Sequence, residues 1–294
     1  MGRLEQGIGR RRGDAEKRMH GVDVGALLRL RVGCRFAFES PLPAASVFLV
    51  QPRNCGDRFV QSESWTTEPL LPLRDYTDGY GNLCRRMTLP AGAASATYDA
   101  LVVAPGDADE SDPSAPAHDP ADLPDETLVY TLPSRYCLSD TLAGRAIELF
   151  GGLPRGWGQV QAVCDWVHQH VQFAYGSSTP LTTAVDVLER GVGVCRDYAH
   201  LAIAFCRALN VPARYAFGYL PDIDVPPTDA AMDFAAWFEA YLGGRWWIFD
   251  PRNNERRKGR ITIAYGRDAL DVAMVTTYGL LTLREMTVWT DLVP

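Results

Sequence analysis

A glycine-rich turn followed by a cysteine and a helix-like segment (residues 191–209, GVGVCRDYAHLAIAFCRAL) constrains the fold more than any other stretch of this chain. Apolar residues recur at helical spacing after Cys195, so we predict a helix that begins there and buries one face. These residues are Tyr198, Leu201, Ala202, Phe205 and Leu209. A thiol at a helix N-terminus lies near the positive end of the helix dipole and near unpaired backbone N–H groups, which stabilise the thiolate. The stretch therefore predicts a nucleophilic cysteine on a packed helix.

Length, composition and charge place the chain among ordinary globular proteins. Its 294 residues suffice for one large domain or two medium ones, and 47% of them are hydrophobic. The formal net charge of −7 argues against a nucleic-acid partner. No run approaches the ~20 apolar residues of a membrane span. No apolar segment follows the basic residues near the N-terminus, so we expect neither a membrane partner nor a secretory signal.

The cysteines indicate a reducing environment. They are seven in number, an odd count, and they are scattered along the chain without a C-x-x-C pair. This usage favours reduced and mostly buried thiols and predicts a cytoplasmic location.

The chain divides by composition into three regions before a larger fourth. Residues 1–22 form a basic arm that we expect to be flexible, with Met19 as an alternative start. Residues 23–104 alternate apolar and polar side chains around an Asp-Gly-Tyr-Gly-Asn turn, which predicts a small antiparallel β-sandwich. Residues 105–126, rich in Pro, Asp, Ala and Ser, predict a solvated acidic linker in which His118 is inert.

Residues 127–294 have the pattern of a core domain that mixes helices and antiparallel strands. The periodicity predicts helices over 142–150 and 160–171, then a short helix that is capped by Thr182 or Thr183 and ends at Arg190, then the Cys195 helix, which ends at Asn210. It predicts strands over 214–220 and 261–264, a hairpin of 234–242 and 245–249, and a final strand near 283–289. A short helical patch is expected between residues 264 and 283. We therefore expect an α+β fold in which the cysteine helix packs on an antiparallel sheet.

The hairpin indicates where the partners of Cys195 would lie. A nucleophilic cysteine needs a base, usually histidine, and a carboxylate that orients the base. If Gly243 and Gly244 form a type I′ turn, counting back along the strands places Trp237 opposite Asp250. Position 235 then lies diagonally across from Asp250, about 7–8 Å away. A histidine there could bond to Asp250, but the residue present is Ala235.

Four stretches carry a resemblance to a known family. They are SRYCLSD (134–140), GVCRDYAHLAIAFCRALNVPARYAFGYL (193–220), DFAAWFEAYLGGRWWIFDPRNN (233–254) and GRDALDVAMVTTYG (266–279). Together they resemble the transglutaminase-like superfamily, the bacterial branch of cysteine acyl-transfer enzymes related to papain-type proteases. Residues 27–104, with the DGYGN turn, resemble the β domain that often precedes this core. The resemblance implies a papain-like core with a β-sandwich before it.

The resemblance also implies roles for individual residues. Cys195 matches the family's nucleophile and Asp250 matches its orienting aspartate. The family's usual triplet at the start of the hairpin is His-Ala-Trp, and here it is Ala235-Ala236-Trp237. The position of the general base is therefore occupied by Ala235. Either the histidine was replaced by engineering, or the natural protein lost or reassigned its base.

The other histidines are poor replacements for the base. His200 lies five residues after Cys195, about 140° around the helix from the thiol, so we expect it to be structural. His168 and His170 form an H-x-H motif without a third ligand nearby, which argues against a metal site. His20 belongs to the basic arm. We expect no metal and no cofactor.

Several residues are candidates for contact with a substrate. Arg196 could hold a substrate carboxylate, or it could form an exposed salt bridge with Asp197 at the helix start. Trp237 and Trp246 could line an acyl-binding groove, or they could be core residues of the hairpin. The backbone N–H of Cys195 is a candidate oxyanion donor, and the pattern does not reveal a second one. Cys206, further along the same helix, is expected in the core.

Three functions stay open. The first is an enzyme that forms a Cys195 thioester from an amide of a peptide, a protein or a small molecule. Hydrolysis would make it a peptidase or amidase and aminolysis a transglutaminase, in either case impaired by Ala235. The second is a non-catalytic pseudoenzyme or binding protein with the same fold. The third is an acyltransferase of secondary metabolism whose activated thioester donor needs less help from a base.

Overall fold

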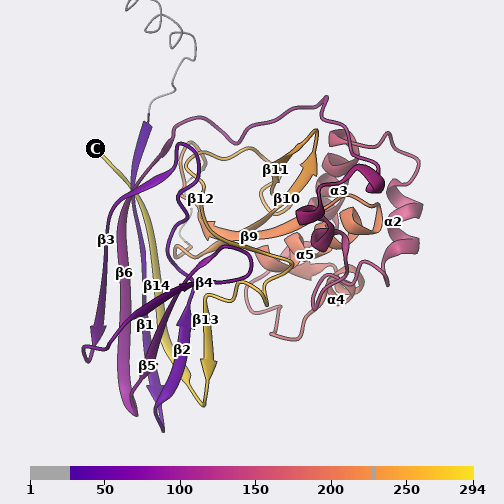
Figure 1. Cartoon of the computed structure of the whole chain (residues 1–294). Coiled ribbons are helices and arrows are strands. Elements are labelled where there is room, and N and C mark those ends of the chain that lie inside the picture. Colours follow the sequence, from indigo (N-terminus) through magenta and orange to yellow (C-terminus); the bar gives the residue numbers. More distant parts are fainter. Residues whose placement is uncertain (1–26, 227–229) are drawn as a thin grey trace, which may run out of the picture.

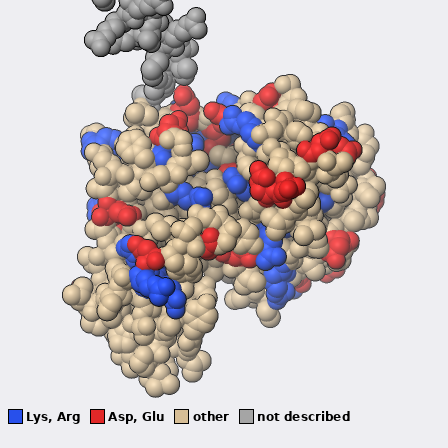
Figure 2. Space-filling model, in the orientation of Figure 1, with Lys and Arg blue, Asp and Glu red and all other residues tan. Residues whose placement is uncertain are grey.

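The computed structural model describes residues 27–226 and 230–294. The predictions about the basic arm, Met19 and His20 lie outside the described residues. Figure 1 shows two lobes side by side, one made of strands and the other of helices around a sheet. Figure 2 shows acidic and basic side chains interspersed over the visible face, except at the lower end of the sandwich lobe, where neither is seen. No helix among the described residues combines the length and the apolar content needed to cross a membrane.

The first lobe is a sandwich of two four-stranded antiparallel sheets. One has the order β14-β1-β6-β3 and the other β13-β2-β5-β4. Their strands are β1 (Leu27–Ser40), β2 (Ala44–Phe48), β3 (Phe59–Glu68), β4 (Arg74–Thr77), β5 (Leu83–Leu89), β6 (Gly92–Pro105), β13 (Val275–Tyr278) and β14 (Thr282–Val293). Side chains of β1 alternate between core and surface, and Phe36 meets Phe48 of the other sheet at 5.9 Å between ring centroids. The predicted β-sandwich is confirmed.

The last two strands of the chain belong to this first lobe. β14 pairs with β1 along almost its whole length, and β13 pairs with β2. Trp289 of β14 packs on Gly33, where a Cβ atom would lie 2.4 Å from the indole ring, and its Nε1 donates to Asp99 at 2.9 Å. The prediction that 127–294 forms one core is wrong here, because alternation identifies a strand without identifying its partner. No helix forms at the predicted patch, where residues 267–274 make turns.

The second lobe places one helix between a sheet and other helices. Strands β9 (Ala213–Tyr219), β10 (Ala235–Leu242), β11 (Arg245–Phe249) and β12 (Ile261–Gly266) form a sheet of order β11-β10-β9-β12. α5 (Cys195–Ala208) contacts β9 and β10 on one side and α2, α3 and α4 on the other (Figure 1). Every residue from Asp197 to Arg207 is buried, so α5 is buried all round rather than on one face as predicted. The α+β fold class is confirmed.

Shorter elements complete the second lobe. They are η2 (Pro120–Asp122), α1 (Asp125–Leu128), η3 (Val129–Thr131), α2 (Ala143–Phe150), α3 (Trp157–His170), β7 (Gln172–Phe173), α4 (Ala184–Arg190) and β8 (Val192–Gly193). Thr183 caps α4 and accepts a bond from the N–H of Asp186, as one of the two predicted caps requires. The predicted helices before Cys195 are therefore confirmed within a few residues.

The segment predicted as a solvated linker is packed against the second lobe. Asp109 is buried, and its backbone N–H donates to the carbonyl of Arg257 at 2.8 Å. His118 accepts the N–H of Gly244 at 2.9 Å, and its ring lies 5.5 Å from that of Tyr241. The predictions of a solvated linker and an inert His118 are wrong. Composition reports few large apolar side chains, but it does not report backbone hydrogen bonds or a buried ion pair.

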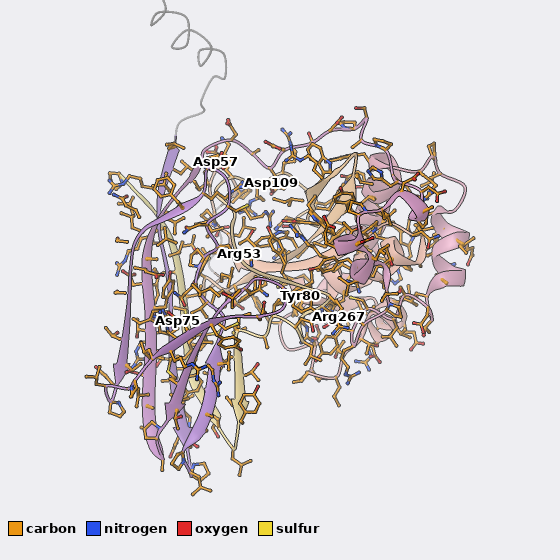
Figure 3. The ribbon with its side chains drawn as sticks, viewed as in Figure 1. Arg53, Asp57, Asp75, Tyr80, Asp109 and Arg267 are labelled. Carbon is orange, nitrogen blue, oxygen red and sulfur yellow. The ribbon has the colours of Figure 1, made fainter. Side chains whose placement is uncertain are left out.

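The Asp-Gly-Tyr-Gly-Asn turn joins the two lobes. Asp78 accepts the N–H groups of Tyr80 and Asn82, both at 2.8 Å, which closes the turn. The Asn82 amide is fully buried and pairs with Tyr265 of β12, donating to its carbonyl at 2.8 Å and accepting its N–H at 2.9 Å. Arg53 also donates to the Asn82 side chain at 2.9 Å. Figure 3 shows Arg53 and Tyr80 near this junction.

Replacing Asn82 is expected to weaken the joint between the lobes. The N82A variant leaves the buried N–H and carbonyl of Tyr265 without partners, and each such group costs about 1–3 kcal/mol. We expect the free energy of unfolding, measured with urea, to fall by ~2–4 kcal/mol. N54A is the control, because Asn54 accepts one bond from Val60 in an exposed loop. Equal losses in the two variants would contradict the structural role of Asn82.

Candidate active site

The turn before Cys195 depends on two glycines. Gly191 ends α4 with a left-handed φ of +62°, which a residue with a side chain rarely adopts. At Gly193 a Cβ atom would lie 2.7 Å from the Cβ of Asp197, so only glycine allows Asp197 to fold back over the helix start. The Asp197 carboxylate then accepts the N–H of Val194 at 2.9 Å. This cap fixes Cys195 as the first residue of α5.

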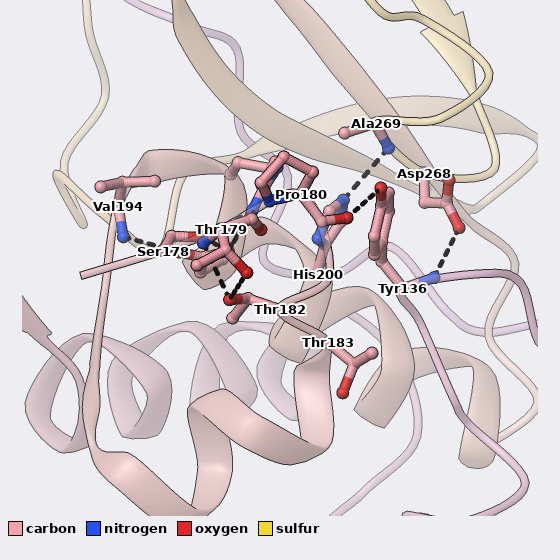
Figure 4. A network of polar contacts seen from close by, with 12 residues as sticks. Tyr136, Ser178, Thr179, Pro180, Thr182, Thr183, Val194, His200, Asp268 and Ala269 are labelled. Carbon is pink, nitrogen blue, oxygen red and sulfur yellow. Dashed lines mark hydrogen bonds and ion pairs between the residues drawn. The ribbon is translucent and has the colours of Figure 1, made fainter. Parts of the chain in front are cut away.

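A polar network holds the loop beside the helix start (Figure 4). Ser178 donates to Asp197 at 3.0 Å, and Arg196 donates to the Thr179 carbonyl at 2.8 Å. The Tyr136 hydroxyl donates to the Pro180 carbonyl, also at 2.8 Å. Arg196 and Asp197 do form an ion pair at 3.4 Å, but Asp197 is fully buried, so the alternative of an exposed salt bridge is wrong.

The hairpin has the predicted register. Leu242 pairs with Arg245, and the pairing continues back to Phe238 opposite Phe249. Gly243 and Gly244 have φ of +58° and +86°, as a type I′ turn requires. Asp250 follows at the end of β11.

The Asp250 carboxylate is saturated with donors. One oxygen accepts the N–H groups of Arg252 at 3.2 Å and Asn253 at 3.0 Å. The other accepts the side-chain amide of Asn253 at 2.8 Å and the guanidinium of Arg260 at 3.0 Å. A carboxylate offers about four acceptor positions. An imidazole at position 235 would therefore have to displace one of these donors to bond with Asp250.

Arg260 is a buried cation that sequence analysis missed. It is 1% exposed and bonds to Asp109 and Asp250, with its guanidinium 4.5 Å from the ring of Trp237. Burial lowers the pKa of Arg260, but the two carboxylates outweigh burial and raise it overall. The only sequence signal is an arginine just before an apolar strand, which does not distinguish a buried cation from an exposed one.

Two cavities meet at Cys195. They share a wall, which we call the shared wall, made of Val194, Cys195, Asp233, Phe234, Ala235 and Ala236. The first, of about 410 Å³, is lined in addition by charged residues and is called the charged cavity: Asp222, Arg252, Glu255 and Arg257. The second, of about 280 Å³, is called the apolar cavity and contains Tyr215, Phe217, Met274 and Arg196. Position 235 thus opens onto free space on both sides.

The Cys195 thiol is less acidic than its helix position predicts. Burial and then the Asp233 carboxylate raise its pKa to about 11, and the backbone N–H groups of Ala236 and Arg196 only partly offset this rise. The expectation of a stabilised thiolate is therefore wrong for the chain as it stands, because the helix dipole does not compensate for burial and a neighbouring negative charge.

Two predicted substrate contacts are not made near Cys195. Trp237 is fully buried beneath Arg260 and lines neither cavity. Trp246 lies against Tyr130 and Arg214 and lines a different cavity. Both tryptophans therefore have the alternative role considered for them, packing in the core or against a neighbouring strand. Arg196 does line the apolar cavity beside the thiol.

The remaining histidines do not face the thiol. The rings of His168 and His170 lie 3.1 and 2.8 Å from backbone carbonyl oxygens. His200 is fully buried, accepts the N–H of Ala269 at 3.1 Å and stacks on Tyr136 (Figure 4). Its structural role is confirmed, as is the core position of Cys206, which is also buried. Among the residues in the two described ranges, no group of three or more His, Cys, Asp and Glu could hold a metal ion.

Asp233 and Tyr215 are further site residues that sequence analysis missed. Asp233 belongs to the shared wall, and burial raises its pKa. Tyr215 lines the apolar cavity, and burial, followed by the charge of Cys195, raises its pKa well above the usual value. Asp233 lies in a loop and Tyr215 in an apolar strand, and neither setting predicts that the side chain lines a cavity beside Cys195. Asp233 stands two residues from the expected base, which is the one available signal.

Removing Arg260 is expected to destabilise this end of the lobe. The R260M variant leaves the buried Asp109 and Asp250 carboxylates without their cation, and breaking such a pair costs about 3–5 kcal/mol. Urea unfolding measures the loss. R245M is the matched control, because Arg245 pairs with Glu110 on the surface, where a pair contributes about 0–1 kcal/mol. A loss below 1 kcal/mol for R260M would contradict the role of Arg260.

Known proteins resemble this chain over much of its length. The model of a family described as the transglutaminase-like superfamily matches residues 146–251. The crystal structure of a proposed cysteine protease from Cytophaga hutchinsonii is 30% identical, with a TM-score of 0.82 over 92% of each chain. An uncharacterised protein of Mycobacterium leprae is 34% identical over 121 residues, covering 39% of this chain and 42% of its own length. The chain thus spans about two fifths of that relative. On this similarity in sequence and structure, the chain belongs to the transglutaminase-like superfamily.

Proposed function

We propose that the protein is a transglutaminase-like cysteine acyl-transfer protein that acts on amide bonds through a Cys195 thioester and is impaired by Ala235. The observation that carries this proposal is the shared wall, where the thiol at the start of α5 and position 235 of β10 face the same two cavities. Asp250, at the end of the paired strand, is the carboxylate that would orient a base. The thiol and its surroundings are thus suited to acyl transfer, and the base is the missing part.

The reaction would begin with attack of the Cys195 sulphur on an amide carbonyl. The carbonyl oxygen becomes negative, and the backbone N–H of Cys195 and the hydroxyl of Tyr215 are the donors we assign to it. The amine then leaves with a proton, and a thioester remains on Cys195. Water releases the acyl group as an acid, as in a peptidase or amidase, and an amine releases it as a new amide, as in a transglutaminase.

The missing base limits the first step. A thiol pKa of about 11 leaves roughly one thiol in ten thousand ionised at pH 7. General-base help contributes about 10²–10⁴-fold to rate. The open space beside Ala235 supports a recent or engineered loss of the histidine, because a settled new role would be expected to fill that space.

A specific observation favours the second candidate, a non-catalytic binding protein. Both Asp250 oxygens already accept two hydrogen bonds each, from Arg252, Asn253 and Arg260, so neither is free for an imidazole. In that case the two cavities would still bind a peptide or a small amide, but no thioester would form. An acyltransferase with an activated thioester donor is the third candidate, since such a donor requires less help from a base.

The setting we propose is a bacterial cytoplasm, with a peptide, a protein or a small acyl compound as partner. The seven cysteines are free, which supports a reducing compartment. The matched mycobacterial proteins support a bacterial source.

Alkylation of Cys195 tests the state of the thiol in the protein as it stands. A pKa raised to about 11 means that the reactive thiolate is scarce at neutral pH and increases as pH rises. We expect the rate of modification by iodoacetamide to rise about tenfold per pH unit from pH 7 to 9 without levelling off. A C55S background removes the one exposed cysteine, and C195S is the control. A plateau below pH 9 would contradict the raised pKa.

Restoring the base tests the function. In the A235H variant we expect cleavage of a casein-derived peptide or of glutamine amides to rise by at least about 10²-fold, because an imidazole can remove the thiol proton. Alkylation of Cys195 at pH 7 should accelerate in parallel. The double variant A235H/C195A is the control and should be inactive. If A235H gains neither cleavage nor thiol reactivity, the binding-protein alternative stands instead.

A further inference from the structure

Asp233 is an acidic side chain placed at the reacting thiol by the packing of its neighbour. Phe234 is buried between the lobes, with its ring 6.5 Å from that of Phe36 in the sandwich and 5.0 Å from that of Phe217 in the core. Asp233 stands just before this anchor, and its carboxylate accepts the N–H of Phe234 at 2.7 Å. The position of the carboxylate is therefore set by both lobes.

The Asp233 carboxylate has no cationic partner among the described residues. Of the arginines that line the two cavities, Arg196 pairs with Asp197 and Arg257 pairs with Asp222. Arg252 forms no ion pair with a described residue; it donates to the Asn253 side chain at 2.9 Å and lies over the ring of Phe173. Asp233 nevertheless lies on the shared wall and acts electrostatically on the Cys195 sulphur. An unpaired carboxylate beside a nucleophile would slow the formation of a thiolate. The same carboxylate would stabilise a positive charge that arrives or develops next to the sulphur.

The two cavities give the thioester two approaches. An acyl group on Cys195 can occupy one cavity while a second reactant enters by the other, and both routes pass the shared wall. Hydrolysis requires no second binding cavity for its acceptor, because water needs little space. Aminolysis by a bulky amine requires one. A primary alkyl amine has a pKa of about 10.4 and arrives as a cation at neutral pH.

We propose that Asp233 recruits the acyl acceptor, a cationic primary amine such as a lysine side chain or a diamine, and accepts its proton during transfer. This inference rests on the proposed function and selects its transglutaminase branch.

The bound ammonium loses one proton to solvent, and the neutral nitrogen attacks the thioester carbonyl. The C–N bond forms and the C–S bond breaks, so the electron pair leaves with the Cys195 sulphur. The second nitrogen proton passes to the Asp233 carboxylate and then to the thiolate. Since the thiol pKa is raised to about 11, the thiolate is the stronger base and the carboxylate is regenerated.

Charge-selective modification tests the placement of Asp233 in the protein as it stands. In the C55S background, Cys195 is treated with three methanethiosulfonates: cationic trimethylammonioethyl, anionic sulfonatoethyl and neutral methyl. The rate of each charged reagent is first divided by the rate of the neutral reagent. The resulting cation-to-anion ratio should be about fivefold or more lower in D233N than in the parent protein. D222N is the matched control, because Asp222 lines only the charged cavity and pairs with Arg257. An unchanged ratio in D233N, or an equal fall in D222N, overturns the inference.

Product partition in the A235H variant tests the role of Asp233 in transfer. With a glutamine-containing peptide as donor, 1,4-diaminobutane competes with water for the thioester. We expect D233N to lower the diamine-to-water product ratio at least tenfold, while the ratio for hydroxylamine, which is uncharged at pH 7, stays within twofold. Turnover with an unchanged diamine ratio overturns the inference and leaves the proposed function standing. Absence of all turnover in A235H overturns the proposed function, and the modification experiment then decides on Asp233 alone.

Discussion

One buried cation organises the end of the core where the site lies. Arg260, just before β12, holds Asp250 of the hairpin and Asp109 of the segment that connects the lobes. Two carboxylates and one guanidinium are stable in the interior only if they stay together, because a charge buried alone is costly. Three segments far apart in the sequence are therefore positioned by a single electrostatic requirement. The strand that carries position 235 is paired to one of them, the hairpin strand that ends at Asp250, so the same requirement helps to position Ala235.

The same interaction accounts for the mixed character of the site. Asp250 is the carboxylate that would orient a histidine, yet all its acceptor positions are filled by Arg260, Asn253 and backbone N–H groups. The thiol is half-buried beside Asp233, with a high pKa. The thiol and the carboxylate are thus both held in place, while Ala235 offers no side chain that could bond to either. With alanine at position 235, Asp250 is satisfied by these other donors.

Features that depend on neighbouring residues in the chain could be predicted from the sequence. The glycine turn, the Thr183 cap and the hairpin register all follow from local rules of backbone geometry, and they place Cys195 and Asp250 correctly. Features that depend on contacts across the fold could not. Nothing local distinguishes the buried Arg260 from a surface arginine, or reveals that Asp233 lines the same cavities as the thiol. The packing of the segment around Asp109 could not be predicted either, because it depends on contacts with distant residues that a polar composition does not indicate.

The return of β13 and β14 to the first lobe makes the second lobe an insertion within the sandwich. The strand that closes one sheet on β1 is synthesised about 250 residues after its partner. During synthesis the first sheet therefore waits with an open edge until the whole inserted lobe has left the ribosome. Pairings of such long range slow folding. The two lobes are consequently expected to fold as one interdependent unit, and neither can be cut from the chain at a single point.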